Sequence, residues 1–165
     1  MGFCQKGTAI SPYVDGGAQE AGMRAGTKNI ATIVGMAVAL QKNVHVMKET
    51  QYHLRNLERM IVAALSNAGI DYIRNGQEPH VPGNLSLSFK GHEGEMLLHR
   101  LDLMGIMVST GSACDSKNTR ISHVLQAIDV DKNYVMGTIR VSLSKDNTEE
   151  EAVQIAESII RIING

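Results

Sequence analysis

The sequence has little cysteine and no tryptophan. Two cysteines, Cys4 and Cys114, occur among 165 residues. They cannot build a disulfide framework, no pair has metal-ligand spacing, and the six histidines are scattered, so no metal site is predicted. A lone cysteine is more often buried and inert than reactive, so a functional role for Cys114 requires further argument.

Long hydrophobic runs and a strong excess of either charge are also missing. No run of about 18 apolar residues is present, so no transmembrane helix is predicted. The N-terminal residues have no apolar signal core. The net charge of −1 points away from nucleic acid or an anionic membrane as a bulk partner. With 43% apolar and 20% charged residues, a globular protein of the reducing cytoplasm is expected.

Residues 28–66 have the periodicity of a long helix. Apolar residues recur at steps of three and four, and no proline interrupts them. Unbroken, this helix would be roughly 55–60 Å long, whereas a domain of this chain length is roughly 40 Å across. The helix is therefore expected to bend or to extend beyond its own domain, and its apolar end then needs a cover. Pairing of two copies through residues 28–45 is the simplest solution.

Residues 67–165 alternate between strand and helix patterns. Strands are expected at 70–73, 84–90, 106–108 and 138–144, and the second and fourth alternate cleanly between apolar and polar residues. Strands of this kind bury one face under helices. The predicted fold class is therefore α/β, an α+β type sandwich with a small, largely antiparallel sheet and helices packed on one face.

The helix boundaries in this region have local signals. A helix that follows Gly94 is expected to end at Gly105, because glycine adopts the left-handed conformation of a C-terminal cap. Ser122 is expected to cap a short helix at 123–128. Thr148 and Glu151 form a capping box for the last helix.

The loop Ser109–Cys114 presents a thiol after a strand, among small residues. A free thiol with a pKa of about 8.5 is only a few per cent thiolate at neutral pH, so reactivity requires help from elsewhere. Lys117 would favour the thiolate and Asp115 would oppose it. The alternative is a surface loop with an incidental cysteine, and the residues alone leave both interpretations open.

Two further motifs match known anion-binding loops only in part. Cys114-x5-Arg120 has the spacing of the phosphatase loop, but it lacks a histidine before the cysteine and a glycine within the loop. The glycine-rich segment Gly17–Thr27 suits an anion at a helix N-terminus, yet it lacks the Lys-Ser/Thr pair of a P-loop. Its plain alternative is an ordinary helix start that is capped by Thr27.

Arg140 lies on the polar face of the expected strand 138–144. A charge at such a place usually faces solvent. The alternative is a carboxylate clamp, which the forked guanidinium of arginine suits better than the point charge of lysine.

Four segments in order resemble the NifS-like cysteine desulfurases, within the fold-type I, class V aminotransferase group. They are GGAQEAGMRAGTKNIATIVGMAVAL, VPGNLSLSFKGHEGEMLLHRLDLMGIMVSTGSACDS, SHVLQAIDVD and GTIRVSLSKDNTEEE. The resemblance covers almost the whole chain. The form Ser-Thr-Gly-Ser-Ala-Cys is similar to the subgroup whose cysteine loop is long and mobile.

The resemblance implies roles for three residues. Cys114 matches the nucleophile that takes sulfur from L-cysteine as a persulfide and leaves alanine. Arg140 matches the arginine that binds the substrate carboxylate, and Thr27 matches the threonine that contacts the phosphate of pyridoxal phosphate across a homodimer. The mobile loop would carry Cys114 to an iron–sulfur scaffold or another sulfur acceptor. The only metal contact implied is Cys114 as a transient shared ligand of an iron–sulfur cluster.

The lysine that binds pyridoxal phosphate in the family has no match here. In the family it lies in a Ser-x-His-Lys-like motif shortly before the segment with which this sequence starts, and no lysine of the chain has that context. The expected organisation is residues 1–27 as a linker or remnant of a large cofactor-binding domain, 28–66 as a connecting helix, and 67–165 as a small domain with the cysteine loop. The chain alone is expected to bind no cofactor and to be inactive.

Two functional interpretations remain open. The first is a desulfurase that is complete only with a large domain. The second is a non-enzymatic module in which Cys114 carries or docks sulfur for a partner. A different pyridoxal-phosphate lyase is disfavoured, because such enzymes need no thiol in this loop.

Overall fold

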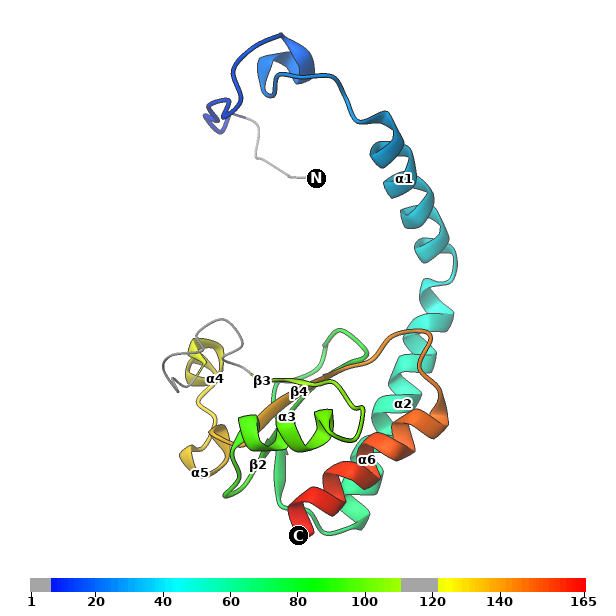
Figure 1. Cartoon of the computed structure of the whole chain (residues 1–165), viewed down its shortest axis with the longest axis vertical. Coiled ribbons are helices and arrows are strands. Elements are labelled where there is room, and N and C mark those ends of the chain that lie inside the picture. Colours follow the sequence, from blue (N-terminus) through cyan, green and yellow to red (C-terminus); the bar gives the residue numbers. More distant parts are fainter. Residues whose placement is uncertain (1–6, 111–121) are drawn as a thin grey trace. The chain divides into compact units, whose positions relative to one another are not determined.

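A computed structural model describes residues 7–110 and 122–165 of the chain (Figure 1). The chain divides into two compact units, Met1–Val46 and Met47–Gly165. No single helix of the described residues is long and apolar enough to cross a membrane, and only α1 and α2 counted together reach the length and composition of such a span.

The N-terminal unit contains a 3-10 helix, η1 (Gln19–Gly22), and the helix α1 (Ile30–His45). Asn29 caps α1, since its side chain accepts a hydrogen bond from the Thr32 amide at 3.2 Å. The expectation that Thr27 caps this helix is therefore wrong. Asparagine is among the strongest N-terminal caps, and Asn29 directly precedes Ile30, the first residue of the helix, whereas Thr27 lies two residues earlier.

The long helix expected at 28–66 is two helices. α1 ends at His45, α2 (Met47–Asn67) begins after Val46, and Val46 itself has φ −98° and ψ 7°. The flanking residues Val44, His45 and Val46 are weaker helix formers than alanine, leucine or lysine. Apolar periodicity continues through the break, which is why the sequence alone suggested one helix.

The C-terminal unit contains, among its described residues, a four-stranded antiparallel sheet in the order β1-β2-β4-β3. Its strands are β1 (Tyr72–Arg74), β2 (Asn84–Phe89), β3 (Ser109–Thr110) and β4 (Thr138–Ser142). Leu85, Leu87 and Phe89 of β2 are fully buried. The predicted alternation of this strand is therefore confirmed.

Three helices cover the apolar face of the sheet: α2, α3 (Gly94–Asp102) and α6 (Glu149–Asn164) (Figure 1). They form one core with the sheet, and its fully buried members include Leu57, Ile61, Leu65, Leu97 and Leu101. The Thr148–Glu151 capping box at the start of α6 is present. The predicted fold class, a small antiparallel sheet with helices on one face, is confirmed.

The segment between α3 and β4 departs from the predicted pattern. The expected strand 106–108 is wrong, because β3 begins only at Ser109. The Gly105 amide donates to the Asp102 carbonyl and the Ile106 amide to the Leu101 carbonyl, so Ile106 still belongs to the end of α3. Gly105 has a φ of 78°, as predicted for the residue that closes this helix.

Two short helices, α4 (His123–Ala127) and α5 (Lys132–Val135), precede β4. The predicted Ser122 cap of α4 is confirmed, because its side chain accepts from the Val124 amide at 3.3 Å. A Cβ atom on Gly137 would lie 2.1 Å from the Phe89 carbonyl oxygen. Only glycine therefore allows the turn after α5 to approach the end of β2 so closely.

Candidate functional site

Arg140 extends from the face of the sheet opposite to the core. Its neighbours in β4, Ile139 and Val141, are buried, whereas Arg140 is exposed. Its Nη2 atom donates a hydrogen bond to Ser109 Oγ at 3.3 Å. No carboxylate of the described residues forms an ion pair with Arg140. Within the described part of the chain, the charge of the guanidinium is thus not neutralised by a carboxylate.

The strand beside Arg140 leads directly to the cysteine loop. Ser109 and Thr110 pair with Arg140 and Ile139, and α4 resumes the described chain after Ser122. Cys114 and the rest of its expected mobile loop lie outside the described residues, as does Arg120. Along the chain, Cys114 follows Thr110 by four residues.

Thr27 lies in the N-terminal unit, whereas Arg140 lies in the C-terminal unit. Its side chain is exposed and makes no hydrogen bond within the described residues. The preceding loop is held by Gln19, whose Oε1 accepts from the Gly26 amide at 3.2 Å, and by a Lys28–Glu20 ion pair of 3.2 Å. The Thr27 hydroxyl is thus available for an anion.

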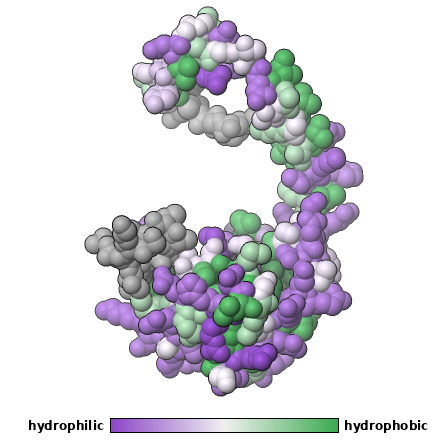
Figure 2. Space-filling view, in the orientation of Figure 1, coloured by the Kyte–Doolittle hydropathy of each residue, from purple (hydrophilic) through white to green (hydrophobic). Residues whose placement is uncertain are grey.

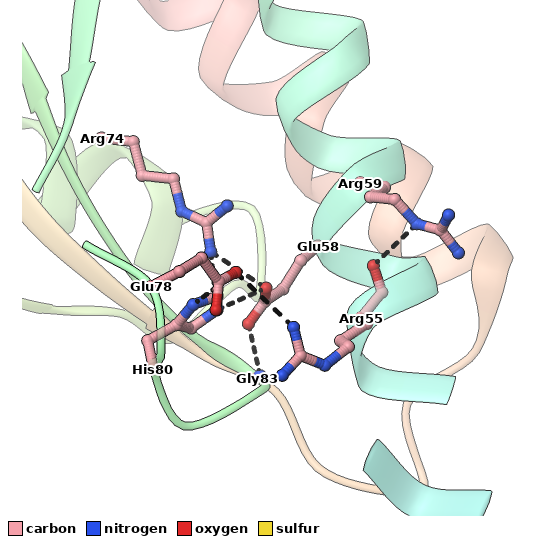
Figure 3. A network of polar contacts seen from close by, with 7 residues as sticks. All are labelled: Arg55, Glu58, Arg59, Arg74, Glu78, His80 and Gly83. Atoms are coloured by element: carbon pink, nitrogen blue, oxygen red, sulfur yellow. Dashed lines mark hydrogen bonds and ion pairs between the residues drawn. The ribbon is translucent and has the colours of Figure 1, made fainter. Parts of the chain in front are cut away.

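A buried carboxylate, Glu58, was not predicted from the sequence. Glu58 of α2 is only 3% exposed, and its Oε2 lies 3.0 Å from Arg74 Nη2 and 2.9 Å from His80 Nε2. Its Oε1 accepts from the Gly83 amide. Figure 3 shows these contacts converging on Glu58 from β1 and from the connection between β1 and β2. Glu58 therefore holds this connection against α2 directly before β2 begins.

A second, exposed carboxylate extends the network. Glu78 Oε1 lies 3.0 Å from His80 Nδ1 and 3.5 Å from Arg55 Nη1 (Figure 3). Desolvation raises the pKa of Glu78, but His80 and Arg55 outweigh it and hold the pKa below its ordinary value. The sequence did carry one signal, because Glu58 falls within the apolar stripe of α2. That stripe contains Leu54, Leu57, Ile61 and Leu65.

A polar cavity of about 280 Å³ borders this network and reaches the open face of the sheet. Ser86 is on its wall and is also the partner of Arg140 in the β2–β4 register. Asn75 Nδ2 donates to Ser86 Oγ at 3.1 Å and to Ser88 Oγ at 2.7 Å. The remaining lining residues are Arg74, Gly76, Gln77, Glu78, His80 and Asn84.

Each unit contains one described residue that suits a part of pyridoxal phosphate or its substrate. Thr27 and Arg140 offer free donors for a phosphate and a carboxylate. No lysine lines the cavity beside Ser86 or the second cavity, of about 270 Å³, beside Ile106 and Val141. Lys28 pairs with Glu20, and Lys90 pairs with Asp71 at 3.1 Å. Neither of these two cavities therefore offers a lysine for a Schiff base from the described residues.

Comparison with known proteins gives a consistent family. The sequence model of the aminotransferase class-V family matches residues 11–155. Cysteine desulfurase IscS of Dictyoglomus turgidum is 38% identical over 162 residues, which cover 98% of this chain and 41% of that protein. Cysteine desulfurase NifS of Azotobacter vinelandii is 33% identical, over 98% of this chain and 40% of its own length.

Solved structures agree. A NifS-like protein that is 37% identical superposes with a TM-score of 0.81, over 98% of this chain and 41% of that one. A NifS-like protein from Rickettsia africae, at 24% identity and a TM-score of 0.80, supports the fold alone. This chain thus spans about 41% of the length of the curated relatives. Its match to the family model and its similarity to IscS and NifS place it in the pyridoxal-phosphate-dependent aminotransferase class V family, among the cysteine desulfurase relatives.

Proposed function

We propose that this chain is the part of a cysteine desulfurase that binds the substrate carboxylate and supplies the sulfur-accepting thiol. The observation that carries the proposal is Arg140, which forms no ion pair within the described residues and is the register partner of Ser109 in β3, the strand that precedes the cysteine loop in the chain. Arginine binds a carboxylate through two parallel hydrogen bonds, which orients the substrate as well as attracting it. The alternative is a non-enzymatic module in which Cys114 carries or docks sulfur.

Each residue has a defined part in the proposed chemistry. Arg140 binds the carboxylate of L-cysteine, and Thr27 donates to the cofactor phosphate. Pyridoxal phosphate, when bound, supplies the electron sink of the reaction. The Cys114 thiolate attacks the sulfur of the bound cysteine, and a new S–S bond forms as the C–S bond breaks. The electron pair of the C–S bond stays with the substrate carbon, which takes up a proton to give alanine.

The proposal includes a homodimer, an iron–sulfur scaffold or other sulfur acceptor as partner, and a cytoplasmic location. Support for the dimer comes from α1, none of whose residues is buried within the described structure. Figure 2 shows hydrophobic side chains along this helix. Self-association through residues 28–45 would cover them. A cytoplasmic location suits a thiol that must stay reduced.

The decisive experiment supplies the part of a relative that this chain does not span. The chain is mixed with the remainder of the Dictyoglomus turgidum protein, pyridoxal phosphate and L-cysteine, and alanine and sulfide are measured. We expect turnover in the mixture, no turnover by the chain alone, and loss of turnover in Cys114→Ala. Turnover by the chain alone would contradict its proposed dependence on another part.

A second experiment separates the enzyme from the sulfur carrier. The chain is treated with a persulfide donor, and the label is mapped by mass spectrometry. We expect labelling of Cys114 rather than Cys4. Labelling of Cys114 together with an inactive mixture would favour the carrier, and equal labelling of both cysteines would remove the case for a specialised thiol.

A further inference from the structure

Among the described residues, Ser109 provides the side chain that accepts a hydrogen bond from the Arg140 guanidinium. The two residues are direct partners in the β3–β4 register, so their side chains lie on the same face of the sheet. Arg140 Nη2 donates to Ser109 Oγ at 3.3 Å. Ser86 is the partner of Arg140 on the opposite side, but its hydroxyl is bonded to Asn75 instead. Arg140 therefore lies between two serines and is held by one of them.

A serine is suited to hold an arginine without using up its charge. A carboxylate in place of Ser109 would form an ion pair and compete with any incoming anion. A hydroxyl accepts one N–H and leaves the other guanidinium donors free. An exposed arginine also loses side-chain entropy when it becomes ordered, and a partner that orders it beforehand lowers that cost on binding.

We propose that Ser109 is a positioning residue that pre-orients the Arg140 guanidinium to bind the carboxylate of the substrate amino acid. This inference rests on the proposed function. Ser109 is also five positions before Cys114 in the chain.

The first test uses the chain itself and does not depend on turnover. Side-chain NMR signals of Arg140, assigned with Arg140→Lys, are followed during titration with L-alanine. We expect Ser109→Ala to weaken binding about three- to tenfold, as for loss of one exposed hydrogen bond to the charged group. Ser109→Thr keeps the hydroxyl and should bind like the original chain, whereas Ser109→Asp should abolish binding. Ser86→Ala is the matched control and should change nothing.

The second test uses the mixture with the remainder of the relative. A positioning role predicts that Ser109→Ala raises KM for L-cysteine about three- to tenfold and leaves kcat nearly unchanged, because the carboxylate is held equally in the ground and transition states. Rescue by Ser109→Thr would exclude a general loss of structure.

The outcomes distinguish the two proposals. The role of Ser109 would be overturned if Ser109→Ala bound L-alanine as tightly as the original chain. It would also be overturned if Ser86→Ala weakened binding as much as Ser109→Ala. Normal kinetics of Ser109→Ala in an active mixture would do the same. An inactive mixture would count against the proposed function, and the L-alanine titration would then decide the role of Ser109 by itself.

Discussion

Helix α1 and the C-terminal unit contain similar apolar residues in different surroundings. In the C-terminal unit, α2, α3 and α6 close over the sheet, and Leu57, Leu87 and Ile139 lose all solvent contact. In α1, Ile30 is 67% exposed and Leu40 is 60% exposed. An apolar stripe becomes a core only when a second layer covers it. The C-terminal unit therefore has the features of an independently stable fold, whereas α1 requires a partner surface.

The sharpest test of this difference is one substitution made in both regions. Leu87→Ala should destabilise the C-terminal unit by about 2–5 kcal/mol, because it opens a cavity in a sealed core. At concentrations at which the chain is monomeric, Leu40→Ala should change the free energy of unfolding by less than about 0.5 kcal/mol, because its side chain is then mostly exposed. Urea unfolding followed by circular dichroism measures both. Equal losses would show that α1 is covered within the chain itself.

A smaller effect is expected at the buried carboxylate. Glu58→Ala leaves Arg74, His80 and the Gly83 amide without their shared acceptor, which should cost about 2–3 kcal/mol. Glu78→Ala removes an exposed carboxylate from the same network and should destabilise the unit much less than Glu58→Ala, because solvent screens its ion pairs. Thermal unfolding of both variants compares them. Equal destabilisation by the two substitutions would mean that burial of Glu58 does not strengthen its contacts.

Helix caps provide a third comparison between the regions. Thr148→Ala should lower the stability of the C-terminal unit by about 1 kcal/mol, because it breaks a capping box on a packed helix. Asn29→Ala should leave that cooperative transition unchanged and instead speed amide exchange in the first turn of α1. Hydrogen exchange with mass spectrometry reads both effects. If both substitutions lowered global stability, the two units would unfold together as one cooperative structure.

The smallest effect should be the pH dependence of an exposed cluster in the C-terminal unit. A hydrogen bond from Tyr134, together with Lys90, holds the pKa of Asp71 below its ordinary value. A depressed carboxyl pKa adds stability above the unfolded-state pKa, and this contribution disappears as pH falls through the folded-state pKa. The Tm difference between the original chain and Asp71→Asn should therefore be present at pH 7 and shrink as the pH falls below the ordinary aspartate pKa of about 3.9. A difference that persists at the lower pH would indicate another cause.

Much of the C-terminal unit could be predicted because its signals are local. The alternation in β2, the stop at Gly105 and the Thr148–Glu151 box each depend on residues a few positions apart. The predicted placement of Arg140 on the polar face of a strand followed from the same alternation. Its partner could not be predicted, because the Ser109 contact depends on how β3 pairs with β4, 31 positions along the chain.

The sequence by itself determined the alternation of β2, the capping residues Ser122 and Thr148, and the family, because these depend on short segments and on ordered motifs. Only the tertiary structure decided that the described part of β3 consists of Ser109–Thr110 and that Glu58 is buried against Arg74 and His80. Both outcomes depend on contacts between residues distant in sequence, where backbone hydrogen bonds and burial override the local pattern. The same non-local contacts bring Ser109 to the guanidinium of Arg140.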